Sequence, residues 1–305
     1  MPSKLFGLIV IGGGPAGSTA ALYATRMGVK TLLLEREIIG GKVNEAPFVE
    51  NYPGFIRIQG LDLGRRFKDH LIKEGVDFHT LEKVLDLDLL GDTKSVKTNI
   101  ADYRTKTVII ATGGRHRKLG VPGEDEFIGK GVGYCALCDA TPLKGKKVAV
   151  IGSGNTASVS SIYLTKFASE VFLIPRGHKI KAERCLKNRI DELGIQTIYE
   201  REVTRMEGEE WLQRVFLKDR KTGVEEALDV GGVIVCIGIL PESELARRAG
   251  VAVNERGYIK VDGSMRTNID GVFAAGDITG GIQQITTSVG EGTLAAISAC
   301  ERLSM

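Results

Sequence analysis

The sequence has no long hydrophobic run, few aromatic residues and little excess of one charge. No stretch approaches the roughly 18 apolar residues of a membrane span, and the opening MPSKLFGLIVIGGG runs from a short apolar segment straight into a glycine turn. The net charge of +3 comes from scattered Lys and Arg, which gives no basic patch for nucleic acid. We therefore expect a cytoplasmic protein with neither a membrane anchor nor a nucleic-acid partner.

Cysteine is also scarce, and its spacing excludes one class of protein. The chain has five cysteines among 305 residues, an odd number with a single close pair, which is unlike the disulfide framework of a secreted domain. Glycine is abundant, with 39 residues, so many turns can bring backbone close to a neighbour or a ligand. The length is sufficient for two domains.

The first 35 residues predict a strand–turn–helix–strand unit of a parallel sheet. The apolar run 8–11 predicts a strand, GGGPAG (12–17) a glycine turn, residues 18–28 a helix, and TLLLE (31–35) a second strand. The same order recurs about 140 residues later. There KVAVI (147–151) predicts a strand, GSGNTA (152–157) a glycine turn, 158–169 a helix, and EVFLI (170–174) a strand that stops at a proline.

Each unit has the residue types that a dinucleotide needs. In the first, Gly12 permits a tight turn, Gly14 lets the backbone approach a pyrophosphate, and Gly17 allows the helix to pack closely on the strand. Glu35 closes the second strand, where a ribose hydroxyl would need an acceptor. The alternative reading is an ordinary turn followed by a solvated glutamate.

The second unit differs where the ribose would lie. Gly152, Gly154 and Ala157 occupy the three small positions, but the second strand is followed by PRGHKIKAER, which contains cations and no early acid. An acid at this place favours NAD, whereas Arg176 and Lys181 suit the 2′-phosphate of NADP. A basic, solvated helix start is the alternative. Two dinucleotide units in one chain suggest FAD in one and a nicotinamide cofactor in the other.

The close cysteine pair lies in GYCALCDAT (133–141), between the two glycine units. A zinc site would need two further ligands, and the nearest candidates, Cys185 and His116, belong to no second close pair. A structural disulfide is uncommon inside a cell, and this one would close a very small ring. A dithiol–disulfide couple beside a flavin is the third reading. Asp139 could then exchange a proton with a thiol, or simply cap a turn.

Taken in order, these motifs resemble the low-molecular-weight thioredoxin reductases over nearly the whole chain. The resemblance rests on GGGPAG, GGKVNEAPFVENYPGF (40–55), IIATG, CALCD, GSGNTA and FAAGD. It implies an α/β fold with two Rossmann-like domains of the three-layer ββα type, the second inserted into the first. The FAD-binding domain would comprise about 1–113 and 242–305, and the NAD(P)H-binding domain with the redox pair about 114–241. It also implies a homodimer.

The resemblance assigns roles to individual residues. Cys138 would be the thiol nearest the flavin, Cys135 would attack the disulfide of the partner, and Asp139 would handle the thiol proton. The positions implied for FAD are Gly12, Gly14, Pro15, Ala16, Gly17, Glu35, Gly41, Lys42, Asn51, Val84, Gly113, Gly276, Asp277, Gln284 and Ile285. Those expected for NADP are Gly152, Gly154, Asn155, Thr156, Ala157, Arg176 and Lys181. No metal is expected.

The chain departs from the family pattern at three places. The usual His-Arg-Arg-x-x-x-Arg run is reduced to Arg176 and Lys181, Gln283 replaces an arginine, and Lys42 replaces a glutamine near the flavin. We still expect NADPH, because the glycine turn is intact and the cations favour phosphate.

The expected function is reduction of thioredoxin or a glutaredoxin-like protein by NADPH through FAD and the cysteine pair. The alternatives are the same chemistry with a reduced deazaflavin or ferredoxin as donor, a dithiol oxidase that passes electrons to oxygen, and a flavin-binding redox sensor without sustained turnover.

Overall fold

The computed structural model describes residues 5–46, 49 and 51–304, and it divides into two compact units. Unit 1 comprises Met1–Arg115 and Leu240–Met305, and unit 2 comprises His116–Ile239. The two crossings between them, β7 (Gly114–His116) and β16 (Ile239–Pro241), pair as a two-stranded ribbon. The expected boundaries, 113/114 and 241/242, fall at the ends of this ribbon. The predicted mixed α/β fold with parallel sheets is confirmed.

Unit 1 is built on a seven-stranded sheet in the order β3-β2-β1-β6-β5-β4, with β17 paired to β6. Strands β1, β2, β3, β6 and β17 are parallel, and β4 and β5 join antiparallel. The strands are β1 (Leu5–Ile11), β2 (Thr31–Leu34), β3 (Asp77–His79), β4 (Val84–Asp88), β5 (Lys94–Thr98), β6 (Asp102–Ile110) and β17 (Val272–Ala274). The helices are α1 (Pro15–Arg26), η1 (Gly41–Glu45), α2 (Gly60–Lys73), α6 (Glu244–Arg248), η3 (Asp277–Thr279) and α7 (Ile285–Ser304).

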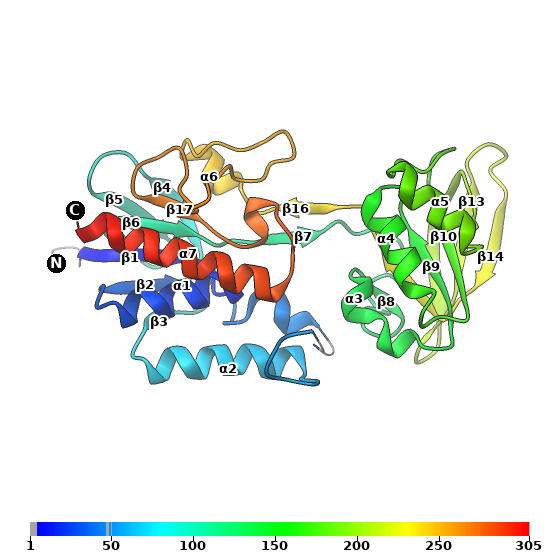
Figure 1. Cartoon of the computed structure of the whole chain (residues 1–305), viewed down its shortest axis with the longest axis horizontal. Helices are drawn as coiled ribbons and strands as arrows, with labels where there is room; N and C mark the ends of the chain where they lie inside the picture. The colour runs from blue at the N-terminus through cyan, green and yellow to red at the C-terminus, as the bar shows by residue number, and fades with distance from the viewer. Residues whose placement is uncertain (1–4, 47–48, 50, 305) are drawn as a thin grey trace. The chain divides into compact units, whose positions relative to one another are not determined.

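Strand β1 is apolar on both faces because each face is covered. Leu8 and Val10 pack into the core shared with α1 and α7, whereas Ile9 and Ile11 pack into the opposite core with residues of β4, β5 and α6. Side chains alternate along a strand, so a continuous apolar run indicates a strand buried on both sides. Figure 1 shows α7 lying along α1 over this sheet. No helix of the described ranges is long and apolar enough to cross a membrane.

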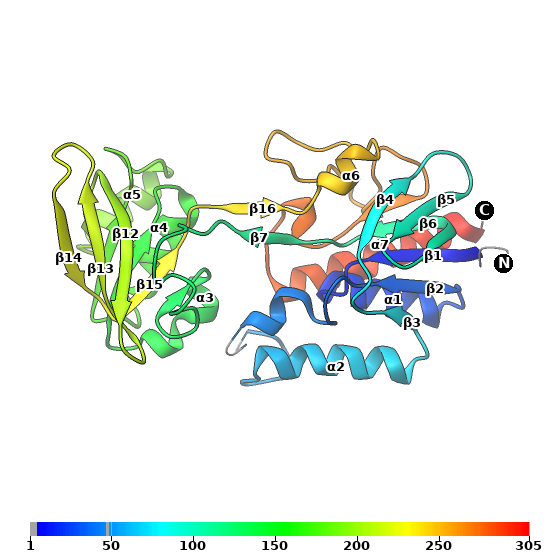
Figure 2. The ribbon, with the colours of Figure 1, turned by 180° about the vertical axis from the view of Figure 1, so that it is seen from behind.

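Unit 2 contains a five-stranded parallel sheet in the order β11-β10-β9-β15-β8 and a separate antiparallel sheet, β12-β13-β14 (Figure 2). One face of the parallel sheet packs against β12–β14 and the other against the helices, which gives three layers. The strands are β8 (Val132–Gly133), β9 (Lys147–Ile151), β10 (Glu170–Ile174), β11 (Gln196–Thr197), β12 (Arg201–Gly208), β13 (Leu212–Asp219), β14 (Glu225–Asp229) and β15 (Gly232–Val235). The helices are α3 (Ala136–Asp139), η2 (Thr141–Leu143), α4 (Asn155–Leu164) and α5 (Arg184–Glu192).

Both dinucleotide-type helices begin three residues earlier than the sequence predicted. Helix α1 starts at Pro15, whose fixed φ and missing N–H suit the first helical position. Helix α4 starts at Asn155 and ends at Leu164, five residues before the expected end at 169. The chain turns away there because Ser169 donates its backbone N–H to the carbonyl of Lys146, and Phe167 accepts one from Gly145.

Helix packing in unit 1 depends on glycine at particular positions. A Cβ on Gly17 would overlap the carbonyl oxygen of Gly12, and a Cβ on Gly292 of α7 would overlap the carbonyl of Ala16 in α1. Gly290 lies in the same helix, but it is exposed and has open space around it. The close contact between α1 and α7 therefore requires glycine at position 292 but not at position 290.

We predict that Gly292→Ala destabilises the protein by about 1–3 kcal/mol, because α7 must move away from α1. Its matched control, Gly290→Ala, should stabilise by about 0.4–1 kcal/mol, because alanine restricts the unfolded chain and suits a helix interior. Urea unfolding followed by circular dichroism measures both. Equal shifts for the two variants would show that the α1–α7 contact is looser than described.

Candidate active site

The carboxyl ends of β2, β1, β6 and β17 meet at one edge of the sheet of unit 1. The glycine turn follows β1, Glu35 follows β2, Gly113 follows β6 by three residues, and Gly276 follows β17. Ligands of open α/β sheets bind outside this edge. We call these segments, together with 40–42, the cradle.

Glu35 is buried and bonded to the glycine turn. Its Oε2 accepts the backbone N–H of Gly13 at 2.5 Å, and its Oε1 accepts that of Glu37 at 2.8 Å. Its own carbonyl accepts the N–H of Glu82, which places Val84, at the start of β4, near the same end of β2. The glutamate is therefore held by backbone contacts rather than solvated.

The glycine turn leaves open space where a phosphate would approach. A Cβ on Gly12 would overlap the backbone of Ala111, so the turn packs tightly against the residue that follows β6. A Cβ on Gly14, in contrast, would meet nothing within 4 Å. Gly14 caps α1 without a side-chain hydrogen bond, and the first turn of α1, which contains Pro15 and Ala16, has no acidic residue. The first N–H groups of the helix can therefore bind an anion. These features fit a dinucleotide pyrophosphate.

Further predicted residues come together around this turn. A Cβ on Gly41 would lie 3.0 Å from Gly14 Cα, and one on Gly276 would lie 2.9 Å from Ala16 Cβ. The ammonium of Lys42 forms an ion pair with the carboxylate of Asp277, 235 residues away in sequence.

Two other predicted residues meet beside the start of α7. Asn51 Nδ2 donates to Gln284 Oε1 at 3.1 Å, next to Ile285, the first residue of the helix. Pro47, Phe48 and Glu50, which belong to the 40–55 motif, lie outside the described residues.

Glu291 was not predicted from the sequence to belong to this site. From α7, its Oε2 accepts the backbone N–H of Gly276 at 2.7 Å and the hydroxyl of Thr279 at 3.1 Å. It thereby fixes the turn that carries Asp277. The only sequence signal was an acid between the two helical glycines, Gly290 and Gly292.

In unit 2 the cysteine pair lies at the corresponding edge of the parallel sheet. Strand β8 ends at Gly133, and Cys135 is the N-cap of the four-residue helix α3, which packs against α4. The glycine turn follows β9 and Cys236 follows β15, so parallel pairing gathers the thiols and the second glycine turn at one edge.

Asp139 is bonded to the backbone at the start of α3. Its Oδ2 accepts the N–H groups of Tyr134 and Cys135, both at 3.1 Å. Burial raises the pKa of Asp139, although these two backbone hydrogen bonds lower it in part. The carboxyl group therefore keeps its proton to a higher pH than an ordinary aspartate. Gly133 makes this position available, because a Cβ there would overlap Asp139 Oδ2.

The pKa of Cys135 is shifted in the opposite direction. A hydrogen bond from the Cys138 thiol lowers the pKa of Cys135, and the backbone N–H groups of Cys138 and Leu137 lower it further. Burial and the charge of Asp139 oppose this shift without cancelling it. The lowered pKa increases the fraction of Cys135 present as thiolate, which is the nucleophilic form of cysteine.

The remaining cysteines have other environments. Cys236 lies just beyond β15 and is half-buried, and burial raises its pKa to about 11. Cys185 is exposed on α5, and His116 stacks on Tyr134 with 5.1 Å between ring centroids. In the described part of the chain, no three His, Cys, Asp or Glu side chains are arranged to hold a metal ion.

The second glycine turn has the expected shape. A Cβ on Gly152 would overlap the carbonyl of Cys236 and lie 2.9 Å from Ala157 Cβ, whereas Gly154, the N-cap of α4, faces open space. Asn155 exchanges two hydrogen bonds with Glu183, of 2.8 and 3.0 Å. Thr156 is exposed.

The two predicted cations of unit 2 face solvent. Arg176 follows β10, its side chain is 72% exposed, and its nearest acid is Glu202 at 3.7 Å. Lys181 is also exposed, and its backbone N–H donates to the carbonyl of Ser153 in the glycine turn at 2.6 Å. Both cations are thus close in structure to the turn and available to an anionic ligand.

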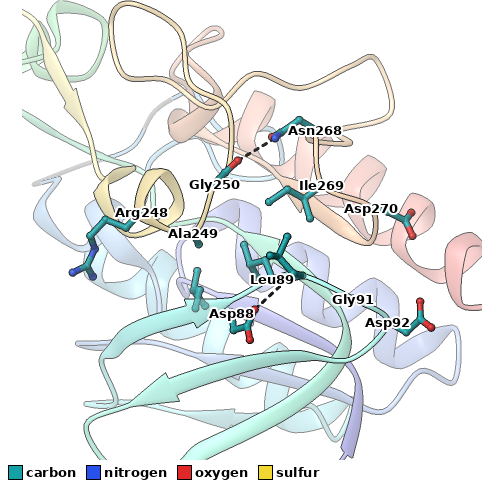
Figure 3. A pocket seen from close by; sticks show the side chains of 12 residues that line it. Asp88, Leu89, Gly91, Asp92, Arg248, Ala249, Gly250, Asn268, Ile269 and Asp270 are labelled. Carbon is teal, nitrogen blue, oxygen red and sulfur yellow. Dashed lines mark hydrogen bonds between the residues drawn. The ribbon is translucent and has the colours of Figure 1, made fainter.

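Unit 1 also has a hollow away from the cradle, shown in Figure 3. It is lined by the segments Leu87–Asp92, Arg248–Gly250 and Asn268–Asp270, where Asn268 Nδ2 donates to the carbonyl of Gly250 at 3.0 Å. These last residues precede β17, whereas Gly276 follows it. The hollow therefore lies at the opposite edge of the sheet and contains none of the predicted site residues.

Comparison with known proteins confirms the expected resemblance. The family described as pyridine nucleotide-disulphide oxidoreductase matches residues 6–292. The thioredoxin reductase of Bacillus subtilis (strain 168) is 39% identical over 300 residues, which are 97% of this chain and 94% of that protein. The crystal structure of thioredoxin reductase from Streptococcus pyogenes MGAS5005 covers 99% of both chains with a TM-score of 0.91 and 35% identity. A ferredoxin-flavin thioredoxin reductase from Clostridium acetobutylicum covers 98% of both chains with a TM-score of 0.54 and 32% identity.

We predict that Cys135 in the reduced protein reacts with iodoacetamide down to a lower pH than an ordinary thiol. Cys138→Ala should raise the midpoint of this pH profile, because it removes the hydrogen bond that lowers the pKa of Cys135. Asp139→Asn should lower the midpoint, because it removes an opposing negative charge. Mass spectrometry of the alkylated peptide provides the rate. Shifts of the same sign in both variants would contradict this account.

We also predict that Gly133→Ala slows exchange between the reduced pair and a small aliphatic disulfide, whose basic thiolate needs a proton as it leaves, by about tenfold or more, since a positioned acid contributes about 100-fold or more to such proton transfers. The added Cβ must displace the carboxylate of Asp139 from its two backbone donors. Gly177→Ala is the matched control in unit 2, because a Cβ there has open space. An unchanged rate in Gly133→Ala would show that Asp139 needs no fixed position.

Proposed function

The chain belongs to the pyridine nucleotide-disulphide oxidoreductase family, and we propose that it reduces the disulfide of thioredoxin with electrons from NADPH. The single observation that carries this proposal is the thiol pair at the sheet edge of unit 2. There one cysteine has a lowered pKa, and a half-buried acid with a raised pKa and a second glycine turn lie at the same edge. A structural disulfide would use none of these features, and in the described part of the chain no three His, Cys, Asp or Glu side chains are arranged to hold a metal ion.

We propose FAD as the group held by the cradle of unit 1. The uncapped start of α1 and the open space above Gly14 suit its pyrophosphate, and Glu35 suits the ribose next to the adenine. When bound, the flavin supplies two-electron transfer between the nicotinamide and the cysteine pair. The domain roles follow: unit 1 is the FAD-binding domain, and unit 2 is the nucleotide-binding and disulfide domain.

The cysteine pair performs the exchange with the partner. The Cys135 thiolate attacks one sulfur of the partner disulfide, that S–S bond breaks, and Asp139 gives a proton to the departing thiolate. Cys138 then attacks Cys135 Sγ and its proton passes to the second departing sulfur. The partner leaves as a dithiol and the chain keeps a Cys135–Cys138 disulfide. The lowered pKa of Cys135 and the raised pKa of Asp139 support these roles.

We propose NADPH at the second glycine turn. The N-terminus of α4 has no acid in its first turn, and Arg176 and Lys181 are exposed where the 2′-phosphate would require cations. Gly152, Gly154, Asn155, Thr156 and Ala157 form the turn around the pyrophosphate in this proposal.

The partner of the pair is a thioredoxin, as the relatives imply. A glutaredoxin-like protein is a second acceptor consistent with the same exchange chemistry. We also propose a homodimer, from the family resemblance, and a cytoplasmic location, from the use of cysteine as a reversible couple rather than as a framework.

We predict that NADPH, more than NADH, reduces the flavin of the purified holoprotein under anaerobic conditions. Arg176→Ala combined with Lys181→Ala should raise the apparent Kd for NADPH by about tenfold or more, because a hydrogen bond to a charged group contributes about 1.5–3 kcal/mol. The affinity for NADH, which lacks the 2′-phosphate, should be unchanged.

The matched control for this titration is Lys218→Ala, an exposed cation of unit 2 on β13. It should leave both affinities unchanged. If neither nucleotide reduces the wild-type flavin while dithionite does, the NADPH proposal is wrong. Thioredoxin reduction by the dithionite-reduced protein would then show whether the disulfide chemistry still stands.

A further inference from the structure

The ion pair between Lys42 and Asp277 joins two segments of the cradle. Lys42 lies in η1 and Asp277 begins η3, and their side chains are 32% and 13% exposed. Charges that are partly buried are screened less by water and salt than charges on the surface. The charges of Lys42 and Asp277 therefore exert an electrostatic field on a group bound beside them.

The strand order places this pair at one particular end of the cradle. Across the sheet edge the strands run β2, β1, β6 and β17, with Glu35 after β2 and Asp277 just beyond β17. In the proposed FAD site the adenine ribose lies at Glu35 and the pyrophosphate at the start of α1. The flavin end of the dinucleotide must then lie towards β17, where Lys42 and Asp277 meet.

Reduction of a flavin by two electrons and one proton adds one negative charge to its ring system. A nearby cation stabilises that charge and a nearby anion opposes it. Resting on the FAD site proposed above, we infer that the Lys42–Asp277 pair sets the reduction potential of the flavin. Lys42 favours the reduced state, and Asp277 favours the oxidised state.

A second carboxylate makes Lys42 the decisive charge of this group. Glu291 accepts the N–H of Gly276 and the hydroxyl of Thr279, so it holds the turn that precedes and includes Asp277. Without Lys42, the described contacts of this turn would include two carboxylates, those of Asp277 and Glu291, and no cation. The lysine thus compensates for acids that the fold needs at this place.

The test is the midpoint potential of the holoprotein, measured from flavin absorbance during anaerobic equilibration with reduced redox dyes. Lys42→Gln should decrease the ratio of reduced to oxidised flavin at a given potential by about tenfold, a lowering of about 30 mV for a two-electron couple. Asp277→Asn should shift the midpoint in the opposite direction. The double variant should return close to the wild-type value, because both charges are then absent.

Two controls separate charge from structure. Lys73→Gln removes an exposed cation on α2 of the same unit and should leave the midpoint unchanged. Lys42→Arg keeps the charge and should stay near the wild-type midpoint, even if Lys42→Gln fails to retain FAD.

Two single variants that shift in the same direction, or that both leave the midpoint unchanged, would overturn the inference. Wild-type protein that holds no FAD, seen before any titration from its visible spectrum, would overturn the FAD proposal itself. The two failures are therefore distinguishable.

Discussion

The contact between the backbone of α1 and its neighbours is the constraint on which unit 1 depends. No side-chain atom fits at Gly17 against Gly12, or at Gly292 against Ala16. The backbone of α1 therefore packs directly against the backbone of the glycine turn and of α7. This packing directs the start of α1 at open space above Gly14. The glycines therefore leave the first N–H groups of α1 free to bind an anion, and the other predicted residues of the cradle surround this helix start.

The parallel sheet of unit 2 determines which residues lie together in that unit. Because β8, β9, β10 and β15 run parallel, the residues that follow them share one edge, although they are separated by up to about a hundred residues in sequence. The cysteine pair, the second glycine turn and the two cations gather there for this reason. Local contacts then adjust the chemistry, since the Cys138 thiol and, to a lesser extent, the backbone N–H groups of α3 lower the pKa of Cys135.

Much of this arrangement could be predicted from the sequence because its signals are local. Glycine spacing after an apolar run indicated both glycine turns, and β9 and β10 have the predicted bounds. The roles of Glu291 and Gly133 could not be predicted, nor could the ion pair of Lys42 with Asp277. All three depend on contacts that appear only after folding. Lys42 and Asp277 are 235 residues apart, and Gly133 is needed only because Asp139 returns beside it.

The most direct test of the central claim is an anaerobic count of the electrons that the holoprotein accepts from dithionite. If the cysteine pair exchanges electrons with the flavin, the wild type should accept about two electrons more than the Cys135→Ser, Cys138→Ser double variant, since a dithiol–disulfide couple carries two. The wild-type protein reduced in this way should then convert thioredoxin disulfide to dithiol. Equal electron counts in the two proteins would contradict the account, because they would show that the pair takes no part in electron transfer.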